Sequence, residues 1–296
     1  TSDMNPHAMS GNQSTPNLYR LGLQDMLRSG VPFLVGGAFA LENYTGVVRR
    51  TKDLDVFALR KDVDGLMRFL ASAGYETEVR FPHWISKAHK GGHVIDIIFG
   101  SGNGICAVDQ KWFDAAPVAT IMGERVRLVP AEEMIWSKAF VMERDRYDGA
   151  DIAHLLHARS DRLDWGRLLW RFDRHWRVLF SHLVLFGFVY PRRRLQIPHW
   201  LMLELIQRLC MEMQTLSSDR DICQGTLLSW GQYLDHIECG EYKDARRHPC
   251  GSLTAGEIKF VTERFQEEQG GYQGTRTVAE DFVLRDGPPR LSEPAA

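Results

Sequence analysis

The chain has 296 residues, a length typical of about two domains of roughly 150 residues each. Hydrophobic residues make up 44% of it and charged residues 25%, which excludes a disordered or collagen-like chain. Its formal net charge of -2 means that the protein as a whole is not an electrostatic match for nucleic acid.

Apolar runs and cysteines indicate the compartment. The longest apolar stretch, 178–190, is interrupted by Ser181 and His182 and is shorter than the about 18 residues that a membrane span needs. The first residues do not have the pattern of a secretory signal peptide, which is a basic segment followed by an apolar one. Its five cysteines have irregular spacing, which does not indicate a disulfide framework. We therefore expect a cytoplasmic protein with no membrane partner.

Residues 1–16 are polar and aperiodic, and they predict a disordered arm. From there to residue 129, segments of helical spacing alternate with short apolar or alternating runs, which predicts an α/β (α+β) domain over 17–129. The expected helices are 18–27, 38–44 and 62–73. The expected strands are 31–35, 53–59, 75–80, 84–88, 93–99, 118–122 and 125–129.

The character of the sequence changes at Pro130, after which nearly every segment has helical spacing. We expect an all-helical domain over 130–284 and a disordered tail over 285–296, which is rich in proline. The expected helices of this domain are 131–144, 148–158, 165–186 and 199–213.

Three aspartates stand out because they occur in predicted strands. Asp53 and Asp55 are two residues apart, so their side chains leave the same face of a strand about 6.6–7 Å apart. Two carboxylates tolerate this proximity when a hard divalent cation such as Mg²⁺ or Mn²⁺ lies between them. Asp96 lies among four branched aliphatic residues, where an acid is costly without a charged or metal partner.

Gly36 and Gly37 follow a buried strand and open a helix. Glycines at that position let a ligand approach the backbone, and the N–H groups of a helix N-terminus favour phosphate. Together with the aspartates, this pattern indicates a site for a metal-bound polyphosphate.

The ordered set Gly36, Gly37, Asp53, Asp55 and Asp96 resembles the polymerase-beta-like nucleotidyltransferase superfamily. The wider segment GGAFALENYTGVVRRTKDLDVF is similar to the branch of tRNA-modifying toxins, close to antibiotic-modifying enzymes. This resemblance implies a nucleotidyltransferase fold with a mixed sheet, and the transfer of a nucleoside monophosphate from a nucleoside triphosphate to an acceptor, with release of pyrophosphate.

The resemblance also implies roles for individual residues. Asp53 and Asp55 would hold two metal ions. Asp96 would complete the metal site on the acceptor side and assist deprotonation of the attacking hydroxyl. The backbone around Gly36 and Gly37 would bind phosphate. The remaining candidates for binding the nucleotide and its triphosphate are Arg49, Arg50, Thr51 and Lys138.

A second block strengthens the resemblance. Lys138 lies on a helix predicted to follow the sheet, and it precedes Arg144-Asp145-Arg146-Tyr147-Asp148-Gly149-Ala150-Asp151. In the toxin-like branch a lysine and an Arg-Asp-x-x-Asp motif occupy these places. Asp148 and Asp151 are therefore candidates for supporting the site.

Each of these residues also has a structural interpretation. Asp53 and Asp55 could be exposed acids, and Asp96 a salt-bridged structural acid. Arg49 and Arg50 could be a solvated pair and Lys138 a surface lysine, while Asp148 and Asp151 suit a helix N-terminus.

Three other groups have no assigned role. Residues 159–194 hold nine arginines against three acids, with tryptophans between them, a pattern of nucleic-acid binding or of an ordinary packed helix. His89 and His93 flank a Gly-Gly turn near the third aspartate. His236, Cys239, His248 and Cys250 fit no standard zinc spacing.

Three functions therefore compete. The first is a transferase acting on tRNA or another macromolecule, with a possible antidote protein as partner. The second is a transferase acting on a small molecule such as an antibiotic. The third is a nucleotide-binding scaffold without turnover.

Overall fold

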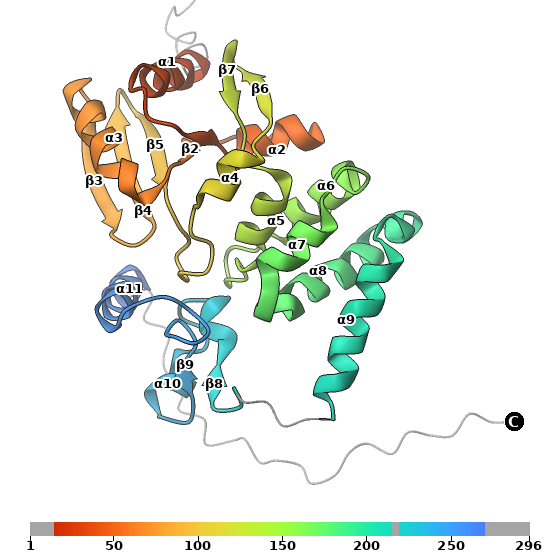
Figure 1. Ribbon diagram of the computed structural model, residues 1–296. Coiled ribbons are helices and arrows are strands. Elements are labelled where there is room, and N and C mark those ends of the chain that lie inside the picture. Colours follow the sequence, from red (N-terminus) through yellow and green to blue (C-terminus); the bar gives the residue numbers. More distant parts are fainter. Residues whose placement is uncertain (1–14, 215–218, 270–296) are drawn as a thin grey trace, which may run out of the picture.

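The structure is a computed structural model that describes residues 15–214 and 219–269. A five-stranded sheet organises its first half (Figure 1). Its strands lie in the order β1-β2-β5-β4-β3. They are β1 (Leu34–Val35), β2 (Asp53–Phe57), β3 (Glu76–Phe81), β4 (Ile85–Lys90) and β5 (His93–Ile98).

The sheet is mixed, as the sequence predicts. Strands β2 and β5 run parallel, because helix α3 (Arg60–Ser72) and the β3–β4 hairpin intervene between them in the chain. The other neighbouring pairs are antiparallel. The fold class expected from the sequence, a mixed sheet with helices and a helical region after it, is confirmed.

The two faces of the sheet differ because side chains alternate along each strand. Leu54 and Ile95 are fully buried on the face covered by helix α1 (Thr15–Arg28), where they lie close to Gly22 of that helix. Asp55 and Asp96 occupy the alternate positions of the same strands. The aspartates therefore lie on the face that α1 does not cover.

The helices after the sheet share one hydrophobic core with it. Helix α5 packs against α6, α7 and α8, and α6 also packs against α2. The bounds are α2 (Gly37–Thr45), α4 (Gln110–Asp114), β6 (Val118–Ile121), β7 (Glu124–Arg127), α5 (Ala131–Ala139), α6 (Gly149–Arg159), α7 (Trp165–Phe172), α8 (Trp176–Val189) and α9 (His199–Glu212). Beyond them lie β8 (Ile222–Cys223), α10 (Leu234–Glu238), β9 (Lys243–Asp244) and α11 (Ala255–Gln269).

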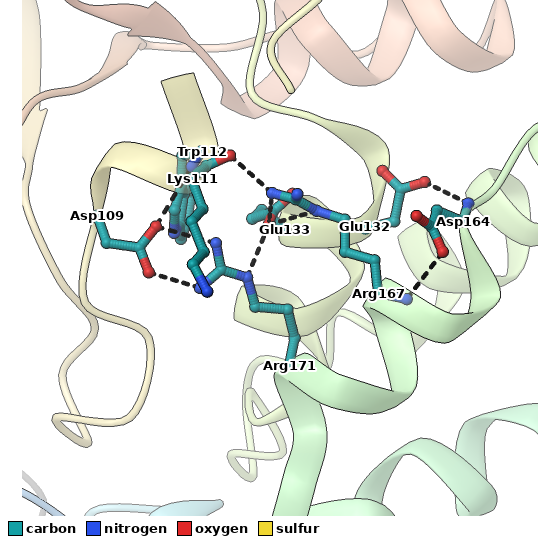
Figure 2. Close-up of polar contacts among 8 residues, drawn as sticks. All are labelled: Asp109, Lys111, Trp112, Glu132, Glu133, Asp164, Arg167 and Arg171. Carbon is teal, nitrogen blue, oxygen red and sulfur yellow. Dashed lines mark hydrogen bonds and ion pairs between the residues drawn. The ribbon is translucent and has the colours of Figure 1, made fainter. Parts of the chain in front are cut away.

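A buried ion-pair network joins the helices to the loop before α4 (Figure 2). Arg171 of α7 binds Glu133 of α5 at 2.8 Å and holds both carboxylate oxygens of Asp109 at 2.7 and 3.0 Å. Arg167, one turn earlier, also binds Glu133. Because Glu133 is fully buried, these cations supply the charge that its carboxylate needs.

Several expected boundaries were wrong. The strand expected over 31–35 is only Leu34–Val35, and the helix expected over 131–144 ends at Ala139. The single helix expected over 165–186 is divided, because Asp173 has a φ of +41° and ends α7 before a short 3-10 turn begins α8. The region after Pro130 is also not entirely helical, since it contains the small β8–β9 pair.

The expected arm over 1–16 overlaps the start of α1, which begins at Thr15. Residues 1–14 and the expected tail over 285–296 lie outside the described residues. Within the described residues, no helix is both long enough and apolar enough to cross a bilayer.

Candidate active site

The structure places two of the three aspartates directly opposite each other. In the parallel β2–β5 pair, Asp55 is the register partner of Asp96, and Asp53 lies two residues before Asp55 on the same face of the sheet. Asp53 is further fixed by Thr51, whose hydroxyl donates to its carboxylate at 2.8 Å. The convergence predicted from the sequence therefore follows from strand pairing.

Asp96 is buried, and it has a cationic partner that the sequence analysis did not name. Lys87 of β4 is its register partner on the other side and donates to both carboxylate oxygens, at 2.8 and 2.9 Å. Burial raises the pKa of the Asp96 carboxyl, and Lys87 opposes that rise. A row of charged side chains, Asp55–Asp96–Lys87, thus crosses the sheet.

The Gly36–Gly37 turn lies directly beneath Asp55. The Gly36 N–H donates to the Asp55 carbonyl at 3.0 Å. Gly37 has a φ of +54°, and a Cβ at this residue would lie 1.8 Å from Oδ2 of Asp55. Only glycine therefore lets the α2 N-terminus and the Asp55 carboxylate come this close.

The electrostatics identify Asp55 as the most perturbed acid of the site. Burial, and next the neighbouring carboxylates of Asp53 and Asp96, raise the pKa of Asp55 to about 7. Lys138 and Arg146 act in the opposite direction. Acids with such perturbed pKa values cluster at functional sites.

Lys138 of α5 belongs to an ion cluster that faces Asp55. Its Nζ lies 3.0 Å from Asp148 and 2.8 Å from Asp151, and Arg49 contacts the other Asp151 oxygen at 2.5 Å. Although burial acts to raise the pKa of Asp148, Lys138 and Arg146 bring it below its ordinary value. Lys138, Asp148 and Asp151, which the sequence singled out, are therefore in contact.

A cavity of about 490 Å³ joins these groups. Gly37, Asp55, Lys138 and Asp148 line one part of it. The rest is largely apolar and includes residues from the β3–β4 turn and from the segment after α9. Another cavity, of about 370 Å³, lies between the end of α1 and the β6–β7 hairpin and contains none of the predicted site residues.

The resemblance implies a divalent cation, and the residues present fit one in part. Asp53 and Asp55 share a face and offer the hard oxygen donors that Mg²⁺ or Mn²⁺ prefers. The crowding that raises the pKa of Asp55 is what a cation between these carboxylates would relieve. Asp96, however, is bound to Lys87, and within 15–214 and 219–269 no three acid, histidine or cysteine side chains form a ready metal cluster.

Other candidates lie away from this site. Arg50 is exposed on the loop before β2. His93 is buried between Tyr19 and Tyr75, and it alternates with Asp96 along β5, so it faces away from the acids. The residues of the zinc alternative, His236, Cys239, His248 and Cys250, form no metal-ligating cluster in the part of the chain that the structure describes.

The arginine- and tryptophan-rich stretch 159–194 is largely engaged in packing. Trp165 and Trp176 are buried, and Arg167 and Arg171 belong to the network of Figure 2. Arg174 and Arg177 pair with acids, while the triplet 192–194 is exposed. These contacts favour the structural interpretation of this stretch.

Sequence reasoning missed the partner of Asp96 and the apolar part of the cavity. The Lys87 pairing follows from the turn at Gly91 and Gly92, because a two-residue hairpin loop fixes the register of its strands. The apolar wall, which includes Trp84 and Trp230, had no such signal, since these residues meet only through the tertiary fold.

Neither the family models nor the curated proteins contain a match to this sequence. Similar solved structures include the antibiotic-resistance factor ANT(2'')-Ia, with 17% identity, a TM-score of 0.43, and 58% of this chain and 98% of that chain covered. The lincosamide antibiotic adenylyltransferase LnuA has 16% identity and a TM-score of 0.36, with coverage of 51% and 100%. An antigenic nucleotidyltransferase-like protein from Paracoccidioides brasiliensis has 15% identity and a TM-score of 0.38, with coverage of 61% and 90%. Nucleotidyltransferase structures are thus among those similar to this chain, at identities and TM-scores too low to transfer what any of them binds.

Proposed function

We propose that the protein is a nucleotidyltransferase that moves a nucleoside monophosphate from a nucleoside triphosphate to an acceptor hydroxyl. The observation that carries this proposal is the register pairing of Asp55 with Asp96 above the Gly36–Gly37 turn, beside a cavity that Asp55 and Lys138 both line. Carboxylates, exposed backbone N–H groups and a lysine in one cavity are the groups that phosphoryl transfer needs.

Each group has a defined task in this reaction. Asp53 and Asp55 would hold Mg²⁺, which neutralises charge on the triphosphate when it is bound. The N–H groups at the start of α2 bind phosphate oxygens, and Lys138 pairs with the triphosphate. The acceptor oxygen bonds to the α-phosphorus as the bond to the bridging oxygen breaks, and pyrophosphate leaves.

The acceptor proton needs a base. Burial raises the pKa of Asp96, which makes it a stronger base than an exposed aspartate. Lys87, which donates to both carboxylate oxygens, stabilises its anionic form. Asp96 is therefore the group that accepts the proton in this proposal.

The Lys87–Asp96 pair also favours a second candidate, a protein that binds nucleotides without turnover. A lysine that neutralises Asp96 reduces its capacity to bind a cation or a proton. In that case the site would bind a metal–triphosphate complex through Asp53 and Asp55 alone.

One experiment distinguishes the two. The protein is incubated with each α-labelled nucleoside triphosphate, Mg²⁺, and separate pools of total tRNA, protein extract and small molecules. Label transfer in one pool, lost in Asp53→Ala and in Asp55→Ala with the fold retained by circular dichroism, supports the transferase. Transfer at the wild-type rate by the double alanine variant would refute the assignment. Tight binding of a non-hydrolysable triphosphate with no transfer in any pool supports the binding protein.

A further inference from the structure

A second row of residues crosses the sheet beside the charged one. Two positions further along their strands, Phe57 pairs with Ile98, Ile98 pairs with Ile85, and Ile85 pairs with Phe81. Because side chains at i and i+2 leave the same face, this apolar row lies about 6.6–7 Å from the Asp55–Asp96–Lys87 row. The side chains on this face of the sheet therefore change from charged to apolar between one row and the next.

Two tryptophans extend the apolar row into the cavity. Trp84, in the β3–β4 turn, stacks on Phe81 with ring centroids 5.8 Å apart. Trp230, from the segment after α9, meets Phe81 edge to face at 5.4 Å and Trp84 at 6.4 Å. Phe57, Phe81, Trp84, Ile98 and Trp230 all line the cavity that contains Asp55.

Trp230 is held in place from both sides. The carboxylate of Glu143, in the loop after α5, accepts the backbone N–H of Trp230 at 2.8 Å and the Ser229 hydroxyl at 2.5 Å. On the other side, a Cβ at Gly102 would lie 2.2 Å from the Trp230 ring. The Trp230 backbone is therefore fixed by Glu143, and its indole packs closely against Gly102.

These aromatic residues also form a small core with Val261 of α11. A core sealed for stability would bury all its members. Phe81 and Ile98 are buried, but Phe57, Trp84 and Trp230 are only half-buried and line the cavity. Phe57, Phe81, Trp84, Ile98 and Trp230 thus form an apolar wall of the cavity. One side of this wall packs against the small core and the other side lines the cavity, as in a ligand site.

We infer that this wall is a stacking site for a flat aromatic ring carried by one of the two substrates. The inference rests on the proposed function, because it takes Asp55 as the reacting end of the cavity. The ring belongs either to the nucleobase or to an acceptor that is a small hydroxyl-bearing aromatic molecule. A cavity of about 490 Å³ suits a molecule of that size. Stacking on aromatic side chains suits either ring.

Calorimetric binding with three probes tests the inference. They are the Mg²⁺ complex of a non-hydrolysable ATP analogue, ribose 5-triphosphate with Mg²⁺, and 2-naphthol. Trp230→Ala should weaken binding of the ATP analogue or of 2-naphthol at least about fivefold, the loss that removal of one stacking partner produces. Ribose 5-triphosphate should bind unchanged. Trp230→Phe should restore most of the affinity.

The pattern of loss identifies the ring. Weaker ATP-analogue binding assigns the wall to the nucleobase, and weaker naphthol binding assigns it to the acceptor. Gly102→Ala, which displaces the indole without removing it, should weaken the same probe. Trp200→Ala is the matched control, since Trp200 is 51% exposed on α9 and does not line the cavity.

Unchanged binding of both ring-bearing probes in folded Trp230→Ala and Gly102→Ala would overturn the inference. So would a wild-type protein that binds the ATP analogue no better than ribose 5-triphosphate and does not bind 2-naphthol. Absence of label transfer in every pool would instead refute the proposed function alone, because ring binding is measured without turnover.

Discussion

Lys87 faces Asp96 across the β4–β5 hairpin, and its ammonium group lies within 2.9 Å of both carboxylate oxygens. Asp96 faces Asp55 on its other side, so this one buried acid stands between a cation and a second acid. The pairing lowers the cost of placing three carboxylates on one sheet face. It also means that Asp96 acts in chemistry only with Lys87 beside it.

Replacement of Lys87 by methionine should destabilise the protein at neutral pH by about 3 kcal/mol, because Asp96 is left buried without its partner. The loss should shrink at acid pH. Without Lys87 the pKa of Asp96 in the folded state rises further, so the folded protein takes up the proton as pH falls and regains stability.

Urea denaturation at pH 7 and pH 5 measures both effects. Lys259→Met is the control, since Lys259 is an exposed lysine of α11 with an exposed acid partner. Equal losses of stability in the two variants at both pH values would show that the Lys87–Asp96 pair contributes no more than an exposed ion pair.

Gly37→Ala should reduce triphosphate binding and label transfer on the order of 100-fold, because the new Cβ would displace the Asp55 carboxylate. Gly46→Ala is a matched control. Gly46 also has a positive φ, +74°, but a Cβ there would meet nothing within 4 Å. Both variants should lose about 1 kcal/mol of stability to backbone strain, measured by thermal denaturation. Equal activity in the two would refute the role of the Gly37–Asp55 contact.

The pKa of Asp55 predicts a pH dependence of stability without metal. Its pKa rises from the ordinary 3.8 to about 7 on folding, so the folded protein holds a proton that the unfolded chain has released. The stability that this proton supplies is complete below about pH 4 and is lost as pH rises through 7. Asp55→Asn should therefore stabilise the protein at pH 8 by about 1–2 kcal/mol, once the solvent that reaches this half-buried group is allowed for.

Thermal melts of wild type and Asp55→Asn in EDTA from pH 5 to pH 8 measure this difference. Adding Mg²⁺ at pH 8 should raise the melting temperature of the wild type and leave that of Asp55→Asn almost unchanged. Parallel melting curves for the two proteins across the range would contradict the shifted pKa.

The sequence was sufficient for the local parts of the site. Asp53 and Asp55 could be placed on one face because the alternation of side chains along a strand is local. The turn at Gly36 and Gly37 could be predicted because two glycines between a strand and a helix allow a close approach to the backbone. Lys138, Asp148 and Asp151 form contacts within 14 residues of one another in the chain, so their grouping could also be anticipated. The Lys87 pairing was available from the Gly91–Gly92 turn.

The rest depended on contacts distant in sequence. No local pattern relates Trp230 to Trp84, because they meet only when the segment after α9 packs against the sheet. The break at Asp173 was hidden for a similar reason. Helical spacing continues through Asp173, and neither glycine nor proline occurs there to mark the break that its positive φ makes.

The network of Figure 2 predicts an unequal cost for two arginines of the same stretch. Arg171→Leu should destabilise the protein by about 3–5 kcal/mol in urea denaturation, because Asp109 loses both of its bonds to Arg171 and the fully buried Glu133 loses one of its two cations. Arg177→Leu should cost no more than about 0.5 kcal/mol, since the Arg177–Glu212 pair is exposed. If the two variants lost equal stability, the buried network would not be what holds α7 to the loop before α4.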